Sequence, residues 1–334
     1  MKLLAGIPAG LAALVAVLAF GGAIYHVFYT SRERRRYRAP GMLIDVGSHR
    51  LHMHCMGAGG PAVVMDAGAG GSSLDWRRVQ PEVAAFTRTC AYDRGGFGWS
   101  ESGPMPRTID RLAEELHALL VNAGIPPPYV LVGHSFAGLN VRQFACKYPD
   151  EVAAIVLVDA THEDISARFP PEFKHLQASA IRLLRFGRVT APFGLPRLLR
   201  RPMAAANLSP GIQPIANALG YRTAAYRTIL AEATAFEESA AQVRRAGALP
   251  SVPVVVLTAG IQQHPPGVPR DRMDEAWRSM QQDLVALSPM GRQIVVDTSG
   301  HFIHLDEPET VIRAIREIVD AVRNAGREPP ATGA

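Results

Sequence analysis

The chain has 334 residues, of which 48% are apolar and 19% are charged, and its formal net charge is +5. This composition is too apolar for a disordered chain and is sufficient for a large hydrophobic core. Its three cysteines cannot all pair with one another, which excludes a small secreted domain held together mainly by disulfides.

The N-terminal segment has the composition of a membrane-spanning helix. Residues 3–28 contain no aspartate, glutamate, lysine or arginine, and about 20 such residues are enough to cross a bilayer. Five arginines follow within residues 32–38. The positive-inside rule therefore predicts a single-pass anchor at residues 1–30, a basic juxtamembrane linker at residues 31–41, and a cytoplasmic location for the remainder.

Two other interpretations of this segment stay open. A secretory signal peptide could be cleaved near Gly21-Gly22-Ala23, after which the remaining domain would be exported. The segment could also form a buried helix of a soluble protein. Against a signal peptide, the apolar run is longer than the usual apolar region of about 7–15 residues.

Short apolar runs and amphipathic runs alternate through the rest of the chain. The first kind predicts strands, and the second, with apolar residues at a 3.6-residue spacing, predicts helices. The predicted strands are residues 41–46, 50–56, 62–65, 88–92, 129–133, 152–158, 252–257 and 293–296, and the predicted helices are residues 74–86, 108–123, 136–147 and 308–323. Strands that alternate with helices indicate an α/β fold, with a mostly parallel sheet flanked by helices on both faces.

The segment from residue 163 to residue 248 interrupts this alternation. It is helical in character, is broken by several prolines, and contains 12 lysines and arginines against 6 aspartates and glutamates. Because it lies between two predicted strands, we expect a helical insertion at residues 163–248 into a core formed by residues 42–162 and 249–326. Residues 327–334 are predicted to form a disordered tail.

Residues 130–138, with the sequence Val-Leu-Val-Gly-His-Ser-Phe-Ala-Gly, predict a strand, a tight turn and a helix. This is the setting of the nucleophile elbow, Gly-x-Ser-x-Gly, in which a sharp turn exposes a serine hydroxyl. Ser135 is therefore the candidate nucleophile, and Ala137 stands in place of the second glycine. An ordinary strand-to-helix turn with an incidental serine is the alternative interpretation.

A serine nucleophile needs a base within hydrogen-bonding reach. His301 follows the last predicted strand on a glycine-bearing loop, and its position after the serine fits the order Ser…Asp/Glu…His. His304, three residues later, is the alternative base. The histidines near the early strands show no spacing typical of a metal site, so the sequence predicts neither a metal nor a cofactor.

With these motifs, the chain resembles the α/β-hydrolase family over residues 42–324. Three motifs carry the resemblance: Gly133-His134-Ser135-Phe136-Ala137-Gly138, Tyr-Asp-Arg-Gly-Gly-Phe-Gly-Trp-Ser at residues 92–100, and Ser-Gly-His-Phe-Ile-His-Leu-Asp-Glu-Pro at residues 299–308. The resemblance implies a serine–histidine pair, and it implies that the insertion is a cap domain above the active site. Related folds that act on epoxides or haloalkanes use an aspartate nucleophile, and a serine at the elbow disfavours those activities.

The resemblance also bears on the acid that completes a catalytic triad. The family usually carries it just after the strand predicted here at residues 252–257, where this chain has no carboxylate before Asp271. A minority of the family carries the acid one strand earlier, where this chain has Asp159. We therefore expect Asp159 to orient His301. Four other carboxylates stay open as alternatives: Asp271, Asp274, Glu163 and Asp164.

Two backbone amides are expected to form an oxyanion hole. One belongs to Phe136, directly after the serine. The other is expected from the glycine-rich loop at residues 66–71, where the resemblance to the family assigns it to Ala69. A flexible glycine loop without this role is the alternative.

Taken together, these features predict a membrane-anchored serine hydrolase that cleaves a carboxylic ester through an acyl-enzyme intermediate. We expect a small, lipophilic acyl substrate and no nucleic-acid partner. Acyl transfer, cofactor-free peroxide chemistry and a non-catalytic ligand-binding role are the alternatives.

The insertion has a second feature that concerns the membrane. Residues 183–188 and 193–201 mix apolar and basic side chains, which suits the surface of an anionic membrane. A solvated pair of helices is the alternative interpretation of these residues.

Overall fold

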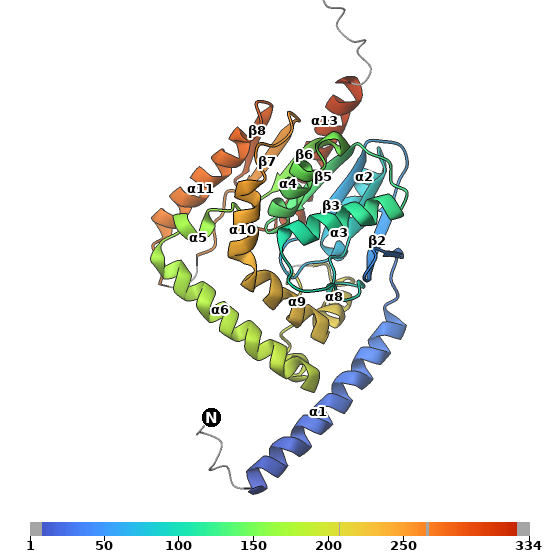
Figure 1. Cartoon of the computed structure of the whole chain (residues 1–334), viewed down its shortest axis with the longest axis vertical. Coiled ribbons are helices and arrows are strands. Elements are labelled where there is room, and N and C mark those ends of the chain that lie inside the picture. Colours follow the sequence, from blue (N-terminus) through green and yellow to red (C-terminus); the bar gives the residue numbers. More distant parts are fainter. Residues whose placement is uncertain (1–8, 207, 265–266, 326–334) are drawn as a thin grey trace, which may run out of the picture.

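The computed structural model describes residues 9–206, 208–264 and 267–325. Residues 1–8 of the predicted anchor and the predicted tail at residues 327–334 lie outside the described part. A long N-terminal helix leads into an α/β domain whose central sheet is flanked by helices (Figure 1).

A sheet of eight strands forms the centre of the described part. The strands are β1 (Met42–Asp45), β2 (Arg50–Met56), β3 (Ala62–Asp66), β4 (Thr89–Tyr92), β5 (Tyr129–His134), β6 (Val152–Val158), β7 (Val254–Ala259) and β8 (Gly291–Val296). Their order is β1-β2-β4-β3-β5-β6-β7-β8, with β1 and β2 antiparallel to their neighbours and all later pairs parallel. The carboxyl ends of β3 to β8 therefore meet at one edge, where ligand sites of such sheets form.

Helices cover both faces of this sheet, as the sequence predicts. On one face lie α3 (Ile109–Asn122), α4 (Ala137–Lys147) and α11 (Arg270–Ala286), and on the other lie α2 (Gln80–Ala84) and α13 (Pro308–Ala325). Burial on both faces of the sheet explains the apolar residues in the middle of strand β5. Leu131 packs into the first layer, and its neighbours Val130 and Val132 pack into the second. Burial on both faces is typical of a parallel sheet.

Helices also fill the chain between β6 and β7, within the range expected for the insertion. They are α5 (Ile165–Arg168), α6 (Pro171–Thr190), the 3-10 turn η3 (Ala191–Phe193), α7 (Leu195–Leu198), α8 (Gln213–Gly220), α9 (Thr223–Thr234) and α10 (Phe236–Arg245). Figure 1 shows α6, α8 and α9 at the end of the domain that faces the N-terminal helix.

The structure corrects one predicted helix. Instead of a single helix at residues 74–86, the chain forms the 3-10 turn η1 (Ser73–Trp76) and then the short helix α2. Pro81 explains the break, because proline has no N–H group and fits only in the first turn of a helix, where it stands in α2.

Some helices and turns of the structure are not among the elements predicted from the sequence. The longest of them is α11, whose buried residues do have a helical spacing. The others are the turn η2 (Pro149–Glu151) and the short helix α12 (Ile303–Asp306). The buried residues of α11 include Met273, Trp277, Met280 and Leu284.

The N-terminal helix α1 (Ala9–Arg36) is long and apolar enough to cross a membrane. Its apolar side chains, such as Leu14, Leu18 and Phe20, are more than half exposed on the surface of the protein. A contiguous exposed apolar surface of this kind indicates contact with a membrane or another protein. The helix is fixed to the domain by Arg197 of α7, whose guanidinium pairs with the carboxylate of Glu33.

A disulfide joins two neighbouring strands. Cys55 of β2 and Cys90 of β4 are directly opposite in the antiparallel register, and their sulfurs are bonded. The sequence does not predict this bond, because the two cysteines are 35 residues apart and only the strand register brings them together. Cys146 is a free thiol.

Candidate active site

Ser135 occupies the sharp turn between β5 and α4. Its backbone φ is +51°, a value that residues other than glycine rarely adopt. The chain is closely packed around this turn, and two glycines leave the necessary space. A Cβ on Gly133 would lie 2.8 Å from the carbonyl oxygen of Ala137, and a Cβ on Gly138 would overlap the side chain of Ala160. The alanine at position 137 is thus accommodated, because it presents its backbone to Gly133.

His301 reaches Ser135 from the loop that follows β8. The Nε2 atom of its imidazole lies 3.0 Å from Oγ of Ser135. The adjacent His134 supports this loop, since its Nε2 atom donates a hydrogen bond of 3.0 Å to the carbonyl oxygen of His301. Burial and the neighbouring imidazoles lower the pKa of His134 well below its usual value, so it remains neutral.

Asp159 lies on the other side of the His301 ring, directly after β6. Its Oδ2 atom is 2.7 Å from Nδ1 of His301, and only 1% of the residue is exposed. Its Oδ1 atom accepts hydrogen bonds from the amide of Ala259 at 3.0 Å and the indole of Trp277 at 3.1 Å. Because a carboxylate only accepts, Nδ1 of His301 carries the proton and Nε2 is free to accept the proton of the Ser135 hydroxyl.

The structure thus brings together Ser135, His301 and Asp159, and it places the alternative residues elsewhere. His304 is buried against Trp76, and burial lowers its pKa to about 3. The alternative carboxylates have other surroundings: Asp274 bonds to His264, Glu163 pairs with Arg142, Asp164 pairs with Arg244, and Asp271 lies in the first turn of α11.

Arg94 is a buried guanidinium that holds the glycine-rich loop after β3. It donates hydrogen bonds to the carbonyl oxygens of Ala67 and Gly68, the latter at 2.9 Å. It also pairs with Asp66 at 2.6 Å and with Glu232 of α9 at 3.0 Å. Burial alone would lower the pKa of Arg94, but the charges of Glu232 and Asp66 raise it, so the guanidinium stays charged.

The two residues expected to form an oxyanion hole lie next to Ser135 and near Arg94. Ala69 is the next residue after the pair of carbonyls that Arg94 binds, and the guanidinium also lies 5.5 Å from the ring centre of Phe136. Both Ala69 and Phe136 line a cavity that Ser135 also lines. The sequence does not predict the link from Arg94 to Glu232 of α9.

Ser135 opens on two cavities. The smaller, of about 320 Å³, is lined by His301 and the loop of residues 68–71. The larger, of about 690 Å³, is lined mainly by apolar side chains of α6, α9 and α10, including Ile181, Leu184 and Ile229. A compound with a substituent on each side of a central reactive group would therefore fit around the serine.

Asp75 lines the smaller cavity. The residue is 3% exposed and forms no ion pair within the described residues. Burial raises its pKa to about 7, although a hydrogen bond from the backbone of Ser72 acts in the opposite direction. Asp75 is not among the candidate residues predicted from the sequence.

A metal site is not found within residues 9–206, 208–264 and 267–325: no group of three or more histidine, cysteine, aspartate or glutamate side chains there could hold an ion.

Comparisons with known proteins agree with this architecture. A model of the alpha/beta hydrolase family matches residues 63–314. The chain is 29% identical over 160 residues to YbdG of Bacillus subtilis, an uncharacterized protein, and the match covers 47% of this chain and about half, 49%, of YbdG.

Two solved structures extend the comparison to most of the chain. A thermophilic esterase from Thermogutta terrifontis is 21% identical with a TM-score of 0.57, covering 84% of this chain and 98% of the esterase. The haloalkane dehalogenase DatA from Agrobacterium tumefaciens is 18% identical with a TM-score of 0.67, covering 84% of this chain and 96% of DatA. At such identities the similarity indicates a shared fold and leaves the reaction open.

We expect the buried carboxyl of Asp75 to make the stability of the protein depend on pH. Its folded pKa of about 7 lies above the unfolded value, so its contribution is complete below about pH 4 and is lost as the pH rises through 7. Between pH 5 and pH 8, we expect wild type to lose about 3 kcal/mol of unfolding free energy that the Asp75→Asn variant does not lose. Urea unfolding at the two pH values measures this.

The matched control is the Asp150→Asn variant, which changes an exposed aspartate. Its stability should follow the wild-type pH dependence. If the unfolding free energies of wild type and Asp75→Asn depended equally on pH, the raised pKa of Asp75 would be contradicted.

Proposed function

The chain belongs to the alpha/beta hydrolase family, and we propose that it is a serine hydrolase that cleaves a carboxylic ester. One observation carries this proposal, namely the continuous hydrogen-bonded series from Ser135 through His301 to Asp159, with distances of 3.0 Å and 2.7 Å. In this arrangement the imidazole accepts the serine proton as the oxygen attacks, and the carboxylate stabilises the imidazolium that forms.

The remaining steps use the surroundings of the serine. The amides of Ala69 and Phe136 stabilise the oxyanion of the tetrahedral intermediate. His301 then gives its proton to the departing alcohol, which leaves an acyl group on Ser135. Water, activated by the same imidazole, attacks the acyl-enzyme and releases the acid.

The two cavities support a substrate with unequal substituents. We assign the larger, more apolar one to the longer apolar substituent and the smaller one to the group on the opposite side of the ester. In this proposal the helices of residues 163–248 form a cap, because α6, α9 and α10 provide most of the larger cavity.

We also propose that α1 anchors the protein in a membrane, given its length and exposed apolar surface. Two features bear on the side that the domain occupies, and they disagree. The arginines at residues 32–38 favour the cytoplasm, whereas the disulfide between Cys55 and Cys90 favours an oxidising compartment. We propose the oxidising side, because cytosolic disulfides are rare, and thereby depart from the expectation based on charge.

The proposed nucleophile and acid are tested by labelling and kinetics. A fluorophosphonate is expected to modify wild type at Ser135, as peptide mass spectrometry would detect, and not to modify Ser135→Ala. The Asp159→Asn variant should lose about 10⁴-fold in kcat on 4-nitrophenyl butyrate, because the imidazole then loses the carboxylate that holds its tautomer. Asp271→Asn is the control and should remain active. Labelling at another serine, or similar losses in the two variants, would count against the proposal.

Arg94 is expected to position the oxyanion loop. The Arg94→Lys variant loses the paired hydrogen bonds to the loop carbonyls, so kcat should fall about tenfold to a hundredfold with little change in KM. Arg142→Lys, which changes a buried guanidinium paired with Glu163, serves as the control. Active sites are counted by phosphonate titration. A loss explained entirely by fewer titratable sites would mean that Arg94 acts only on folding.

The redox state of the cysteines tests the proposed location. Protein from cells denatured in acid should react with a maleimide at one thiol per chain before reduction and at three after it, because only Cys146 is free. The Cys146→Ser variant should show none before reduction. Three reactive thiols in unreduced wild type would contradict the oxidising location and favour the cytoplasm.

A further inference from the structure

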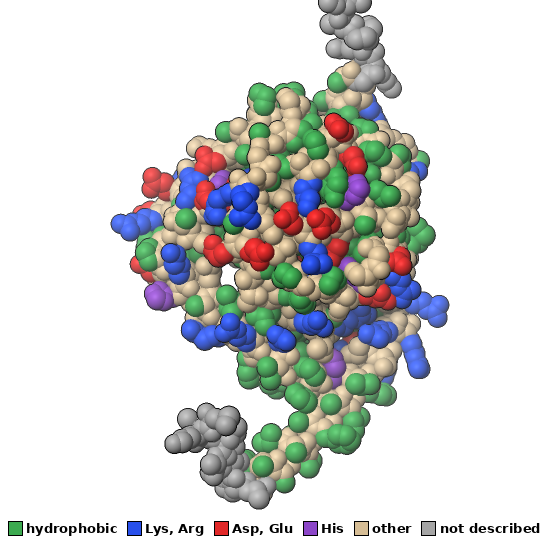
Figure 2. All heavy atoms as spheres, viewed as in Figure 1, with side chains coloured by type: hydrophobic (Ala, Val, Ile, Leu, Met, Phe, Trp, Pro, Cys, Tyr) green, Lys and Arg blue, Asp and Glu red, His purple; other side chains and the backbone are tan. Residues whose placement is uncertain are grey.

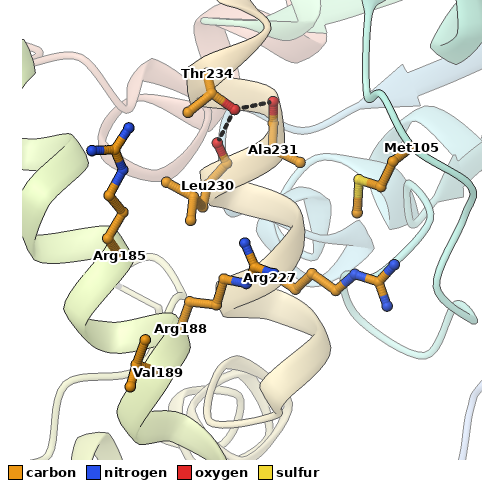
Figure 3. Close-up of a pocket in the computed structure, with 8 residues that line it drawn as sticks. All are labelled: Met105, Arg185, Arg188, Val189, Arg227, Leu230, Ala231 and Thr234. Atoms are coloured by element: carbon orange, nitrogen blue, oxygen red, sulfur yellow. Dashed lines mark hydrogen bonds between the residues drawn. The ribbon is translucent and has the colours of Figure 1, made fainter. Parts of the chain in front are cut away.

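A second large cavity lies between α6 and α9, outside the site described above. Its volume is about 760 Å³. Arg185 and Arg188 of α6 and Arg227 of α9 line it, together with apolar side chains such as Val189 and Leu230 (Figure 3). An arginine-rich cavity with an apolar wall has the chemistry to bind an anion that is attached to an apolar group.

The crossing of the two helices explains why arginines from both of them line one cavity. Gly187 of α6 lies against the ring of Tyr226 on α9, and a Cβ on this glycine would be only 2.7 Å from the ring. Arg188 and Arg227 are the residues that follow Gly187 and Tyr226, so this close approach brings their side chains to the same cavity.

The three arginine side chains are exposed, and Figure 3 shows their guanidinium groups pointing in different directions. None of them has an ion-pair partner among the described residues. Other arginines of the insertion do have partners: Arg168 pairs with Asp283, Arg197 with Glu33, and Arg244 with Asp164. Like charges around one cavity repel one another, and an anion bound among them would remove that repulsion. The cavity therefore favours a negatively charged ligand.

This cavity adjoins the larger cavity of the active site. Arg185 and Thr234 line both of them, and the larger active-site cavity extends to Ser135. A single ligand can thus place an anionic group among the arginines, an apolar portion between α6 and α9, and an ester at the serine.

The arginine-lined cavity also lies at the end of the domain next to the proposed anchor. The turn η3 directly follows α6 and packs on α1 so closely that a Cβ on Gly22 would overlap the carbonyl oxygen of Phe193. Leu183 and Phe186 of α6 are 69% and 54% exposed. Figure 2 shows basic side chains in a row beside apolar ones at this end of the molecule. A ligand could enter here from a membrane surface.

We propose that Arg185, Arg188 and Arg227 bind the anionic group of an amphiphilic ester, such as a phosphate or carboxylate at the end remote from the scissile bond. This inference rests on the proposed ester hydrolysis, and it specifies the substrate class: an ester with an apolar chain that ends in a negative charge.

Matched substrates test the inference on the full-length protein in a neutral maltoside detergent. Each pair consists of a 4-nitrophenyl ester of a dicarboxylic acid with its second carboxylate free and the same ester with that group methylated. For long chains, wild type should prefer the charged member about tenfold in kcat/KM. For succinate, whose free carboxylate is only two methylene groups from the ester, the ratio should be near one.

The variant with Arg185→Gln, Arg188→Gln and Arg227→Gln should lose this preference, so its ratio for long chains falls to about one. Arg182→Gln is the matched control, because Arg182 lies on the same helix but does not line the cavity. Its ratio should match wild type. A preference that persists in the triple variant overturns the inference while leaving ester hydrolysis intact.

A binding measurement separates the site from catalysis. Calorimetry with decyl phosphate below its micelle concentration should detect binding to wild type and equally to Ser135→Ala, and at least tenfold weaker binding to the triple variant. Phosphatidylglycerol vesicles that compete for the same arginines would identify a membrane lipid as the source, and absence of competition would identify a soluble amphiphile. Failure to bind either probe overturns the inference even if esters are cleaved, whereas arginine-dependent binding without ester cleavage would refute only the proposed reaction.

Discussion

The parallel pairing of the central strands is the constraint on which the site depends. It brings the carboxyl ends of β5, β6 and β8 to one edge of the sheet, and Ser135, Asp159 and His301 each follow one of these ends. His301 is 166 residues from the serine and 142 from the aspartate in the chain. A hydrogen-bonded series between such distant residues forms only because the sheet fixes the strand order and the direction in which each loop leaves it.

The residues that the sequence predicts well are those whose role is local. The elbow around Ser135 is recognisable because a strand, a turn and a helix with small neighbours are contiguous in the chain. Asp159 is less evident, since several carboxylates follow the central strands, and the resemblance to a family rather than the local pattern singled it out. The contact that holds Asp159 in place is long-range. Its carboxylate accepts a hydrogen bond from the indole of Trp277, which is 118 residues away on the unpredicted helix α11.

The same reasoning explains what the sequence did not reveal. The Arg94–Glu232 pair joins residues 138 positions apart, and the bond between Cys55 and Cys90 depends on strand register. Neither contact produces a periodic pattern in the amino-acid sequence that could predict it. Both have consequences for function, because the first connects the expected oxyanion loop to the helix that walls the larger cavity, and the second bears on the compartment in which the domain folds. The insertion is therefore linked to the candidate site by a buried ion pair as well as by the cavity that it lines.

The central claim is that a carboxylate after β6 holds the imidazole of the base. The most direct measurement is the proton NMR signal of the His301 Nδ1–H group, in protein with ¹⁵N-labelled histidine. A proton in a short hydrogen bond to a carboxylate resonates far downfield of ordinary amides. We expect that signal in wild type and in Asp271→Asn, and its loss in Asp159→Asn. If the signal persisted without the carboxylate of Asp159 and disappeared without that of Asp271, the account would be contradicted.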